Sequence, residues 1–241
     1  MIRFAFISIL LFPFMAAAQS PLELITDRPD FTESGVTVPR GRVQIESGIL
    51  YDQVVDTGNV VFPEVLVRWA PLNQFELRFG LPNYVAGDFS GGLSDGSVGA
   101  KVQFGPIGSW DLGLIAAVSL PVGEAELTSG TVDPELILIA GRNLSSRVSL
   151  GAQGMLVYDG AEDVWQIGGT LVVGAGLAER AGTFVEAVVI DQRRNSVFVM
   201  LHHGYTYLLT PTLQLDAHAG FGFFEGGGGE GLVGIGLSTL F

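Results

Sequence analysis

Apolar and polar residues alternate along the chain from residue 42 to its end. Val98, Ala100, Val102 and Phe104 alternate with residues that are polar or small: Ser97, Gly99, Lys101 and Gln103. A period of two is typical of a strand with two different faces. We predict twelve strands, at 42–53, 59–70, 73–83, 95–105, 109–120, 134–143, 147–158, 163–177, 182–191, 196–208, 212–224 and 231–241.

The length of these segments favours a membrane protein. Strands of soluble sheets usually have about 5–6 residues, whereas a tilted strand needs about 9–11 residues to cross a membrane. After residue 19 no apolar run is long enough for a spanning helix, and only helices and closed barrels satisfy their backbone groups in lipid. We therefore predict an all-β fold, a transmembrane antiparallel up-and-down β-barrel of about twelve strands. The soluble alternative is a β-sandwich.

The connections between the predicted strands alternate in length. Short links at 71–73, 105–108, 143–146, 178–181 and 209–211 alternate with longer ones, such as 83–94 and 121–133. Outer-membrane barrels have short periplasmic turns and longer external loops. The last strand is apolar on one face and ends at Phe241. Such an ending resembles the recognition signal of the barrel-assembly machinery, which we expect as a partner.

Residues 1–18 have the pattern of a cleaved signal peptide. Arg3 precedes an apolar run that ends at Met15, and three alanines follow. The alternative, an anchoring helix, would be too short and is interrupted by Pro13. We expect three parts: the signal peptide at 1–18, a polar lead-in at 19–41 and the barrel at 42–241. The lead-in has no sustained period and could lie in the periplasm or in the barrel lumen.

The composition agrees with a barrel and excludes several functions. The mean hydropathy is +0.43 with 34 glycines and 15% charged residues, as in sheets that face lipid on one side. The chain has no cysteine, which excludes disulfides and thiolate metal sites. The net charge of −13 excludes a nucleic-acid partner. We expect outer-membrane lipid and a small organic solute as partners, and no cofactor.

Charged residues recur on the predicted inner faces. The lumen-lining candidates are Glu46, Glu64, Arg68, Glu76, Arg78, Lys101, Glu186, Asp216 and His218. Those of 59–70 and 73–83 could form a ladder of ion pairs. The ladder would either select solutes or fill a narrow lumen and fix the strand register. The charged lead-in residues could pair with lumenal cations as a gate, or stay in a periplasmic tail: Asp27, Arg28, Asp30 and Glu33.

Several blocks resemble one family. They are 26–34 (TDRPDFTES), 38–41, 44–48, 63–69, 76–78, 96–101, 120–123, 214–216 and 234–238. The chain resembles the outer-membrane family labelled "putative MetA-pathway of phenol degradation", whose members are often described as transporters. The resemblance spans most of the chain after the signal peptide. It implies a barrel that takes up aromatic or other small organic compounds.

The three histidines raise the question of an enzyme. A pairing of serine with His202 or His218 would suggest an outer-membrane lipid hydrolase, but no serine motif accompanies them. No three-ligand spacing for a metal is visible either. We therefore expect no enzyme and predict a channel or transporter for small organic solutes, aromatic ones among them. The alternative is a plugged structural or binding barrel. The sequence does not name the solute.

Overall fold

The computed structural model describes residues 24–54, 57–87, 91–191, 197–225 and 229–241. Its strands are β1 (Val43–Val54), β2 (Thr57–Phe62), β3 (Leu66–Leu72), β4 (Phe75–Gly80), β5 (Tyr84–Gly87), β6 (Gly91–Leu93), β7 (Gly96–Ile107), β8 (Trp110–Leu120), β9 (Asp133–Asn143), β10 (Val148–Asp159), β11 (Val164–Gly176), β12 (Ala181–Asp191), β13 (Val197–Thr210), β14 (Leu213–Phe224) and β15 (Gly229–Leu240). Within these residues, no helix has the length and apolar character needed to cross a membrane.

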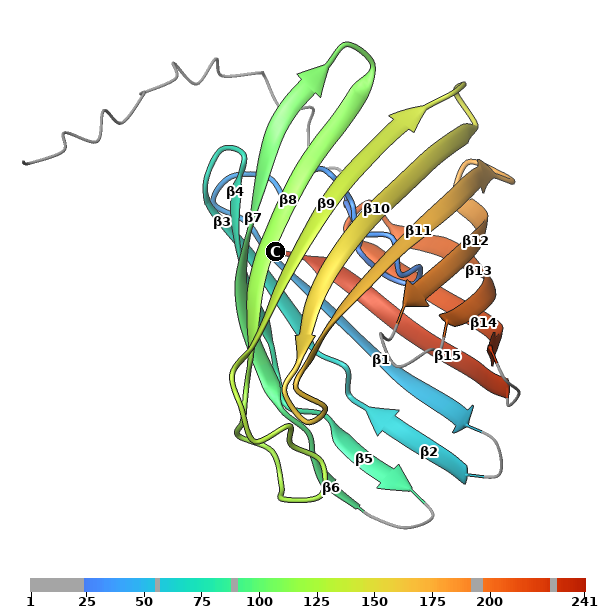
Figure 1. Ribbon diagram of the computed structural model, residues 1–241. Helices are drawn as coiled ribbons and strands as arrows, with labels where there is room; N and C mark the ends of the chain where they lie inside the picture. Colours follow the sequence, from blue (N-terminus) through green and yellow to red (C-terminus); the bar gives the residue numbers. More distant parts are fainter. Residues whose placement is uncertain (1–23, 55–56, 88–90, 192–196, 226–228) are drawn as a thin grey trace, which may run out of the picture.

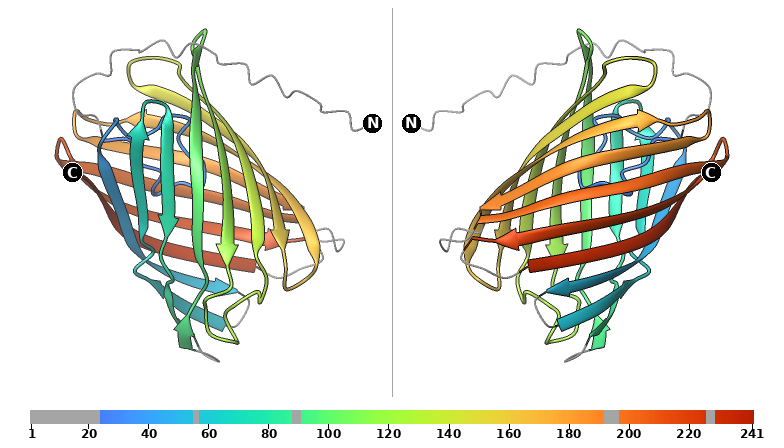
Figure 2. Two further views of the ribbon diagram at one scale, coloured as in Figure 1. Left: turned by 90° about the vertical axis from the view of Figure 1, so that its left-hand side faces the viewer. Right: turned by 90° about the vertical axis from the view of Figure 1, so that its right-hand side faces the viewer.

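The strands close into a barrel (Figures 1 and 2). From β7 to β15 each strand pairs with the next in antiparallel register, and β15 returns to pair with β1. The seam runs from Gln44 opposite Leu240 to Val54 opposite Glu230. This confirms the predicted all-β antiparallel barrel of twelve strands, because β2 with β3, β4 with β5, and β6 with β7 each make one interrupted strand of the wall.

The prediction of continuous strands at 59–70 and 73–83 is wrong, because the first is divided into β2 and β3 and the second is interrupted after β4. One half of β1 pairs with β3 and the other half with β2. The break between β2 and β3 contains Pro63 and Glu64, which has a φ of 47°, and the break between β4 and β5 contains Pro82. Proline has no N–H to donate to a neighbouring strand, so it ends the regular pairing at both places.

The two ends of the barrel differ. At one end, here called the turn end, short links join β3 to β4, β7 to β8, β9 to β10, β11 to β12 and β13 to β14. The longer link between β8 and β9, at 121–132, lies at the opposite loop end. By the rule for outer-membrane barrels, we expect the turn end to face the periplasm. The predicted signal peptide lies outside the described residues.

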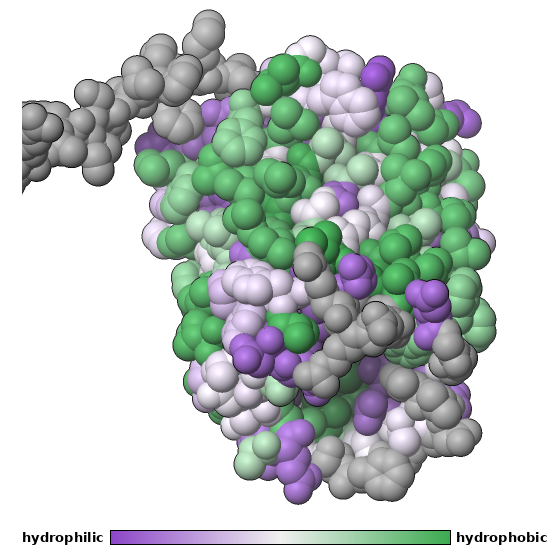
Figure 3. All heavy atoms as spheres, viewed as in Figure 1, coloured by the Kyte–Doolittle hydropathy of each residue, from purple (hydrophilic) through white to green (hydrophobic). Residues whose placement is uncertain are grey.

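The two faces of the wall have opposite character. Large apolar side chains point outward and are well exposed, among them Leu201 (64%), Phe221 (64%) and Ile235 (60%). Figure 3 shows apolar residues over the upper and middle parts of the face in view, and more hydrophilic residues toward the loop end. The charged side chains of Arg68, Lys101 and Glu186 are fully buried inside. The outer face is therefore suited to lipid.

Candidate functional site

The lead-in crosses the lumen. Figure 1 shows it, in blue, inside the ring of strands. Residues 25–38 contact the wall on many sides. The Thr26 hydroxyl accepts a hydrogen bond from Gln214 on β14, and Thr32 contacts Thr170 on β11. Gln153 on β10 forms hydrogen bonds with the backbone of Phe31 and Glu33, and the Val38 N–H donates to Glu76 on β4. The structure thus places this segment in the lumen, one of the two positions that the sequence left open.

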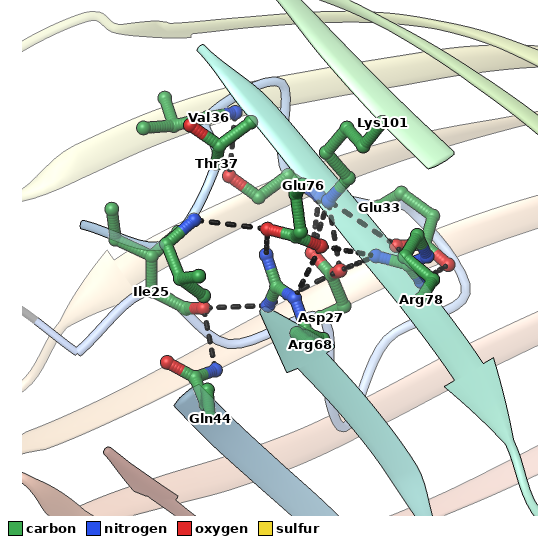
Figure 4. Close-up of polar contacts among 12 residues, drawn as sticks. Ile25, Asp27, Glu33, Val36, Thr37, Gln44, Arg68, Glu76, Arg78 and Lys101 are labelled. Carbon is green, nitrogen blue, oxygen red and sulfur yellow. Dashed lines mark hydrogen bonds and ion pairs between the residues drawn. The ribbon is translucent and has the colours of Figure 1, made fainter. Parts of the chain in front are cut away.

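Asp27 lies at the centre of a cluster of three cations (Figure 4). Its carboxylate is 2.5 Å from Arg78, 2.8 Å from Lys101 and 3.2 Å from Arg68. Although burial by itself would raise the pKa of Asp27, the cations hold that pKa well below its ordinary value. Glu33 adds a second lead-in carboxylate, 2.9 Å from Arg78. The cluster ties the lead-in to β3, β4 and β7.

The wall carboxylates beside this cluster bind both the cations and the lead-in backbone. Arg68 lies 2.8 Å from Glu76 on the neighbouring strand, and Arg78 lies 3.1 Å from the same carboxylate. These contacts of Arg68, Glu76 and Arg78 correspond to the ladder of ion pairs predicted between 59–70 and 73–83. Glu46 pairs with Arg68 at 2.8 Å and accepts the backbone N–H groups of Asp27 and Arg28. Each carboxylate therefore has several donors.

Arg28 reaches the adjoining part of the wall, between β3 and β14. Its guanidinium group lies 3.0 Å from Glu64 and 3.3 Å from Asp216 on β14. Glu64 therefore pairs with the lead-in and not within the wall ladder. Two glycines make room for this side chain: a Cβ at Gly48 or Gly236 would collide with the Arg28 guanidinium. The glycines of β1 and β15 thus have a specific role in docking Arg28.

A third set of contacts involves Glu186 on β12. Its carboxylate accepts the Phe31 N–H at 2.9 Å and the Thr32 hydroxyl at 2.6 Å. His202 Nδ1 lies 3.0 Å from the same carboxylate, and His202 Nε2 lies 2.9 Å from His218 Nδ1. The series of contacts from Glu186 through His202 to His218 lies against the lead-in, and among the described residues no hydrogen bond joins either histidine to a serine. No group of three His, Asp or Glu side chains among the described residues could hold a metal ion.

Apolar clusters line the inner wall on the loop side of the lead-in, and the sequence reasoning missed them. One consists of Val188, Phe198, Met200 and Leu232, each at most 6% exposed. The other consists of Ile115, Ile137 and Ile139. A signal was present in β13, because Phe198 and Met200 share the period-two face of the buried His202. The outward residues of the same strands are also apolar, which hides the alternation.

Solved structures with the same architecture are outer-membrane channels and porins. An outer membrane channel from Pseudomonas putida superposes with a TM-score of 0.67 at 12% identity, over 86% of this chain and 98% of that one. The CymD monoaromatic hydrocarbon channel gives a TM-score of 0.54 at 8% identity, over 84% and 89%. The KdgM porin gives 0.53 at 9% identity, over 81% and 98%. At such identities these likenesses establish the fold.

No curated protein matches the sequence significantly. A family model does match, over residues 26–240, which include most of the lead-in and nearly all of the barrel. The predicted resemblance is therefore confirmed: the chain belongs to the family described as "Putative MetA-pathway of phenol degradation".

Proposed function

We propose that the protein is an outer-membrane channel for small organic solutes, and that the docked lead-in closes it. The observation that carries this proposal is the course of the lead-in, which contacts the wall from β1 to β14 inside the barrel. A barrel of twelve strands has an interior between the filled eight-stranded and the open sixteen-stranded kind. Such a lumen is wide enough for one crossing segment.

The apolar lining of the inner wall favours apolar or aromatic compounds as the transported solutes. On the loop side of the lead-in, buried Met200, Val188 and Leu232 face the lumen, where a channel for hydrophilic solutes would carry polar groups. One of the similar solved structures is a monoaromatic hydrocarbon channel. The lumen-lining candidates Glu46, Glu64, Arg68, Glu76, Arg78, Lys101, Glu186, Asp216 and His218 then form the polar boundary that holds the gate.

Locking the lead-in tests the proposal. Thr32 on the lead-in touches Thr170 on β11, and the chain has no cysteine of its own. A Thr32→Cys, Thr170→Cys double variant can therefore be crosslinked specifically. A deletion strain would be complemented with wild type, the double variant or either single variant, and growth on a limiting aromatic carbon source measured with and without reductant. Intact cells are needed, because apolar solutes cross simple phospholipid vesicles unaided.

We expect the oxidised double variant to grow as slowly as the deletion strain and to recover with reductant, while both single variants grow like wild type. Equal growth of the locked and unlocked forms would show that the lead-in is no gate. Equal growth of the deletion strain and wild type on every carbon source would contradict uptake itself.

A plugged structural or binding barrel is the second candidate. The buried ion pairs of Asp27 and Arg68 favour it, because they hold the lead-in firmly in the lumen. Conductance in planar bilayers separates the two functions. A permanently plugged barrel gives no current at any voltage, whereas a gated one gives openings that the oxidised double variant lacks.

The route to the membrane completes the proposal. Residues 1–18 would serve as a cleaved export signal, and the strand ending at Phe241 would be read by the barrel-assembly machinery. The protein would then lie in the outer membrane with its apolar outer face in lipid, act without enzymatic activity and bind no nucleic acid. Mass spectrometry of the mature N-terminus tests the first step, with a start at Gln19 as the expected result.

A further inference from the structure

A cavity of about 500 Å³ lies on the turn side of the lead-in. Its walls are polar, with hydroxyl and amide side chains from the inner face and the turns of the barrel: Asn143, Ser145, Ser149, Thr183 and Gln214. Asp30 of the lead-in also lines it. A smaller cavity of about 190 Å³, toward β8–β11, shares Asp30, Asn143 and Ser149. Asp30 thus stands between two spaces at the turn end of the lumen.

Asp30 differs from the other carboxylates around it. Asp27, Glu33, Glu46, Glu64, Glu76 and Asp216 each have at least one arginine or lysine partner, and Glu186 has His202. In the described part of the chain, no ion pair or hydrogen bond links the Asp30 carboxylate to another residue. Burial and the nearby Glu186 raise the pKa of Asp30 well above its ordinary value. Its charged form therefore lacks a counter-ion.

The wider charge balance points the same way. The charged residues of 25–38 and the charged wall residues that bind this segment comprise eight carboxylates and four cations among the described residues: Asp27, Asp30, Glu33, Glu46, Glu64, Glu76, Glu186 and Asp216 against Arg28, Arg68, Arg78 and Lys101. Arg28, the cation of this set beside Asp30 in the cavity wall, is already paired with Glu64 and Asp216. Negative charge is therefore in excess in this set, and Asp30 is the carboxylate of the set that has no ion pair.

We propose that this cavity binds a small organic cation, whose ammonium group pairs with Asp30. Its volume lies in the range of about 300–1,000 Å³ that holds small molecules. A bare metal ion fits less well, because no cluster of three His, Asp or Glu ligands exists among the described residues. The hydroxyl and amide groups around Asp30 can hold further polar atoms of the ligand. The proposal does not depend on transport, since the cavity lies on one side of the docked lead-in.

An anion is the competing ligand. Arg147 also lines the cavity, and Arg180 lines the adjoining space at the barrel mouth together with Glu179. Both arginines belong to exposed turns, where an ion pair contributes little because water screens it. The more enclosed Asp30 should therefore decide the sign of the ligand.

Three ligands of nearly equal size and different charge test the proposal: benzylammonium, benzyl alcohol and benzoate. Binding to the purified, folded full-length protein in detergent would be measured by titration calorimetry at pH 8, with heat-modifiable gel mobility as the check of folding. We expect benzylammonium to bind most tightly and Asp30→Asn to weaken it at least tenfold. Glu179→Gln, which removes an acid from the adjoining mouth, should leave binding unchanged.

The pH dependence gives a second readout. Benzylammonium should bind more weakly as the pH falls, since protons compete for the Asp30 carboxylate, and Asp30→Asn should abolish this dependence. Preferential binding of benzoate would assign the cavity to anions and overturn the proposal. So would equal benzylammonium affinity in wild type and a folded Asp30→Asn variant, or no binding of any of the three. None of these results would bear on solute uptake, which the locked lead-in tests separately.

Discussion

The ammonium group of Lys101 on β7 lies 2.8 Å from the carboxylate of Asp27 in the lead-in, and both side chains are almost completely buried. Breaking a buried ion pair by removing one partner costs about 3–5 kcal/mol, because the other charge stays buried without compensation. We therefore expect Asp27→Asn to release the lead-in from the lumen while the barrel remains folded.

Cysteine labelling would measure this release. Val38 is fully buried when the lead-in is docked, and the chain has no other cysteine, so Val38→Cys should react with a maleimide only after undocking. Asp27→Asn should speed labelling by at least tenfold. Glu126→Gln, the same chemical change in an exposed loop, is the control. Equally slow labelling of both variants would mean that Asp27 does not hold the lead-in.

The same carboxylate predicts how docking depends on pH. The cations around Asp27 hold its pKa well below the ordinary value despite its burial. An acid with a lowered pKa in the folded state contributes its stability above its unfolded pKa, about 3.9, and loses it as the pH falls through the lowered value. Asp27 should therefore stay charged from about pH 5 to 7, so it should give docking no pH dependence there. Labelling of Val38→Cys, taken relative to that of the denatured protein at the same pH, should rise through Asp27 only in stronger acid, and a rise that begins near pH 6 would implicate another group.

The glycines that face Arg28 give a third prediction. A methyl group on Gly236 would occupy the position of the Arg28 guanidinium and push it from Asp216. Hydrogen bonds to charged groups contribute about 1.5–3 kcal/mol, so Gly236→Ala should weaken docking by an amount in that range. Gly231→Ala is the matched control on β15, since a Cβ there meets nothing within 4 Å. Equal Val38→Cys labelling in the two variants would remove the glycines from the docking argument.

The sequence predicts the barrel well because every strand must satisfy the same local rule. Period-two alternation identifies the strands from 95–105 onward, and it needs no knowledge of their neighbours. The breaks at Pro63 and Pro82 interrupt two strands that alternation made continuous. Proline shows where pairing can fail, but the pairing of β1 with both β2 and β3 is a property of the closed sheet.

The lumen is harder to predict because its contacts are distant in sequence. Arg28 pairs with Asp216, 188 residues away, and Phe31 bonds Glu186 across 155 residues. The lead-in has no period, so nothing local distinguishes a docked segment from a free tail. The charged residues themselves were visible in the sequence, but the missing partner of Asp30 emerges only when all the pairs are placed.

The apolar outer face of the barrel predicts that the cost of an introduced charge depends on its depth in the membrane. Leu201 is the fifth of the 14 residues of β13 and is 64% exposed on the lipid side, whereas Leu209 lies on the same face, one residue from the turn end of the strand. An arginine costs about 2–4 kcal/mol at the bilayer midplane and about 0–1 kcal/mol near an interface. Leu201→Arg should therefore lower the free energy of unfolding in lipid vesicles far more than Leu209→Arg, as measured by denaturant titration. Equal losses would place the membrane elsewhere on the barrel.

The last prediction concerns Phe241, which lies at the seam of the barrel. Its backbone N–H donates to the Val43 carbonyl at 2.8 Å, and its side chain is 60% exposed on the outside. Deleting it removes one hydrogen bond, worth about 0.5–1.5 kcal/mol, and one apolar side chain, worth less than the about 1.5–3 kcal/mol of a fully buried one. A closed barrel should tolerate this loss. The truncated protein should therefore fold in detergent, as shown by heat-modifiable mobility, yet assemble slowly in cells. Phe241→Ala keeps the backbone bond and should share the defect in cells, because recognition by the assembly machinery would need the aromatic ring. Normal assembly of both variants would leave Phe241 without a role as a signal, and failure in detergent as well would make it a structural residue of the seam.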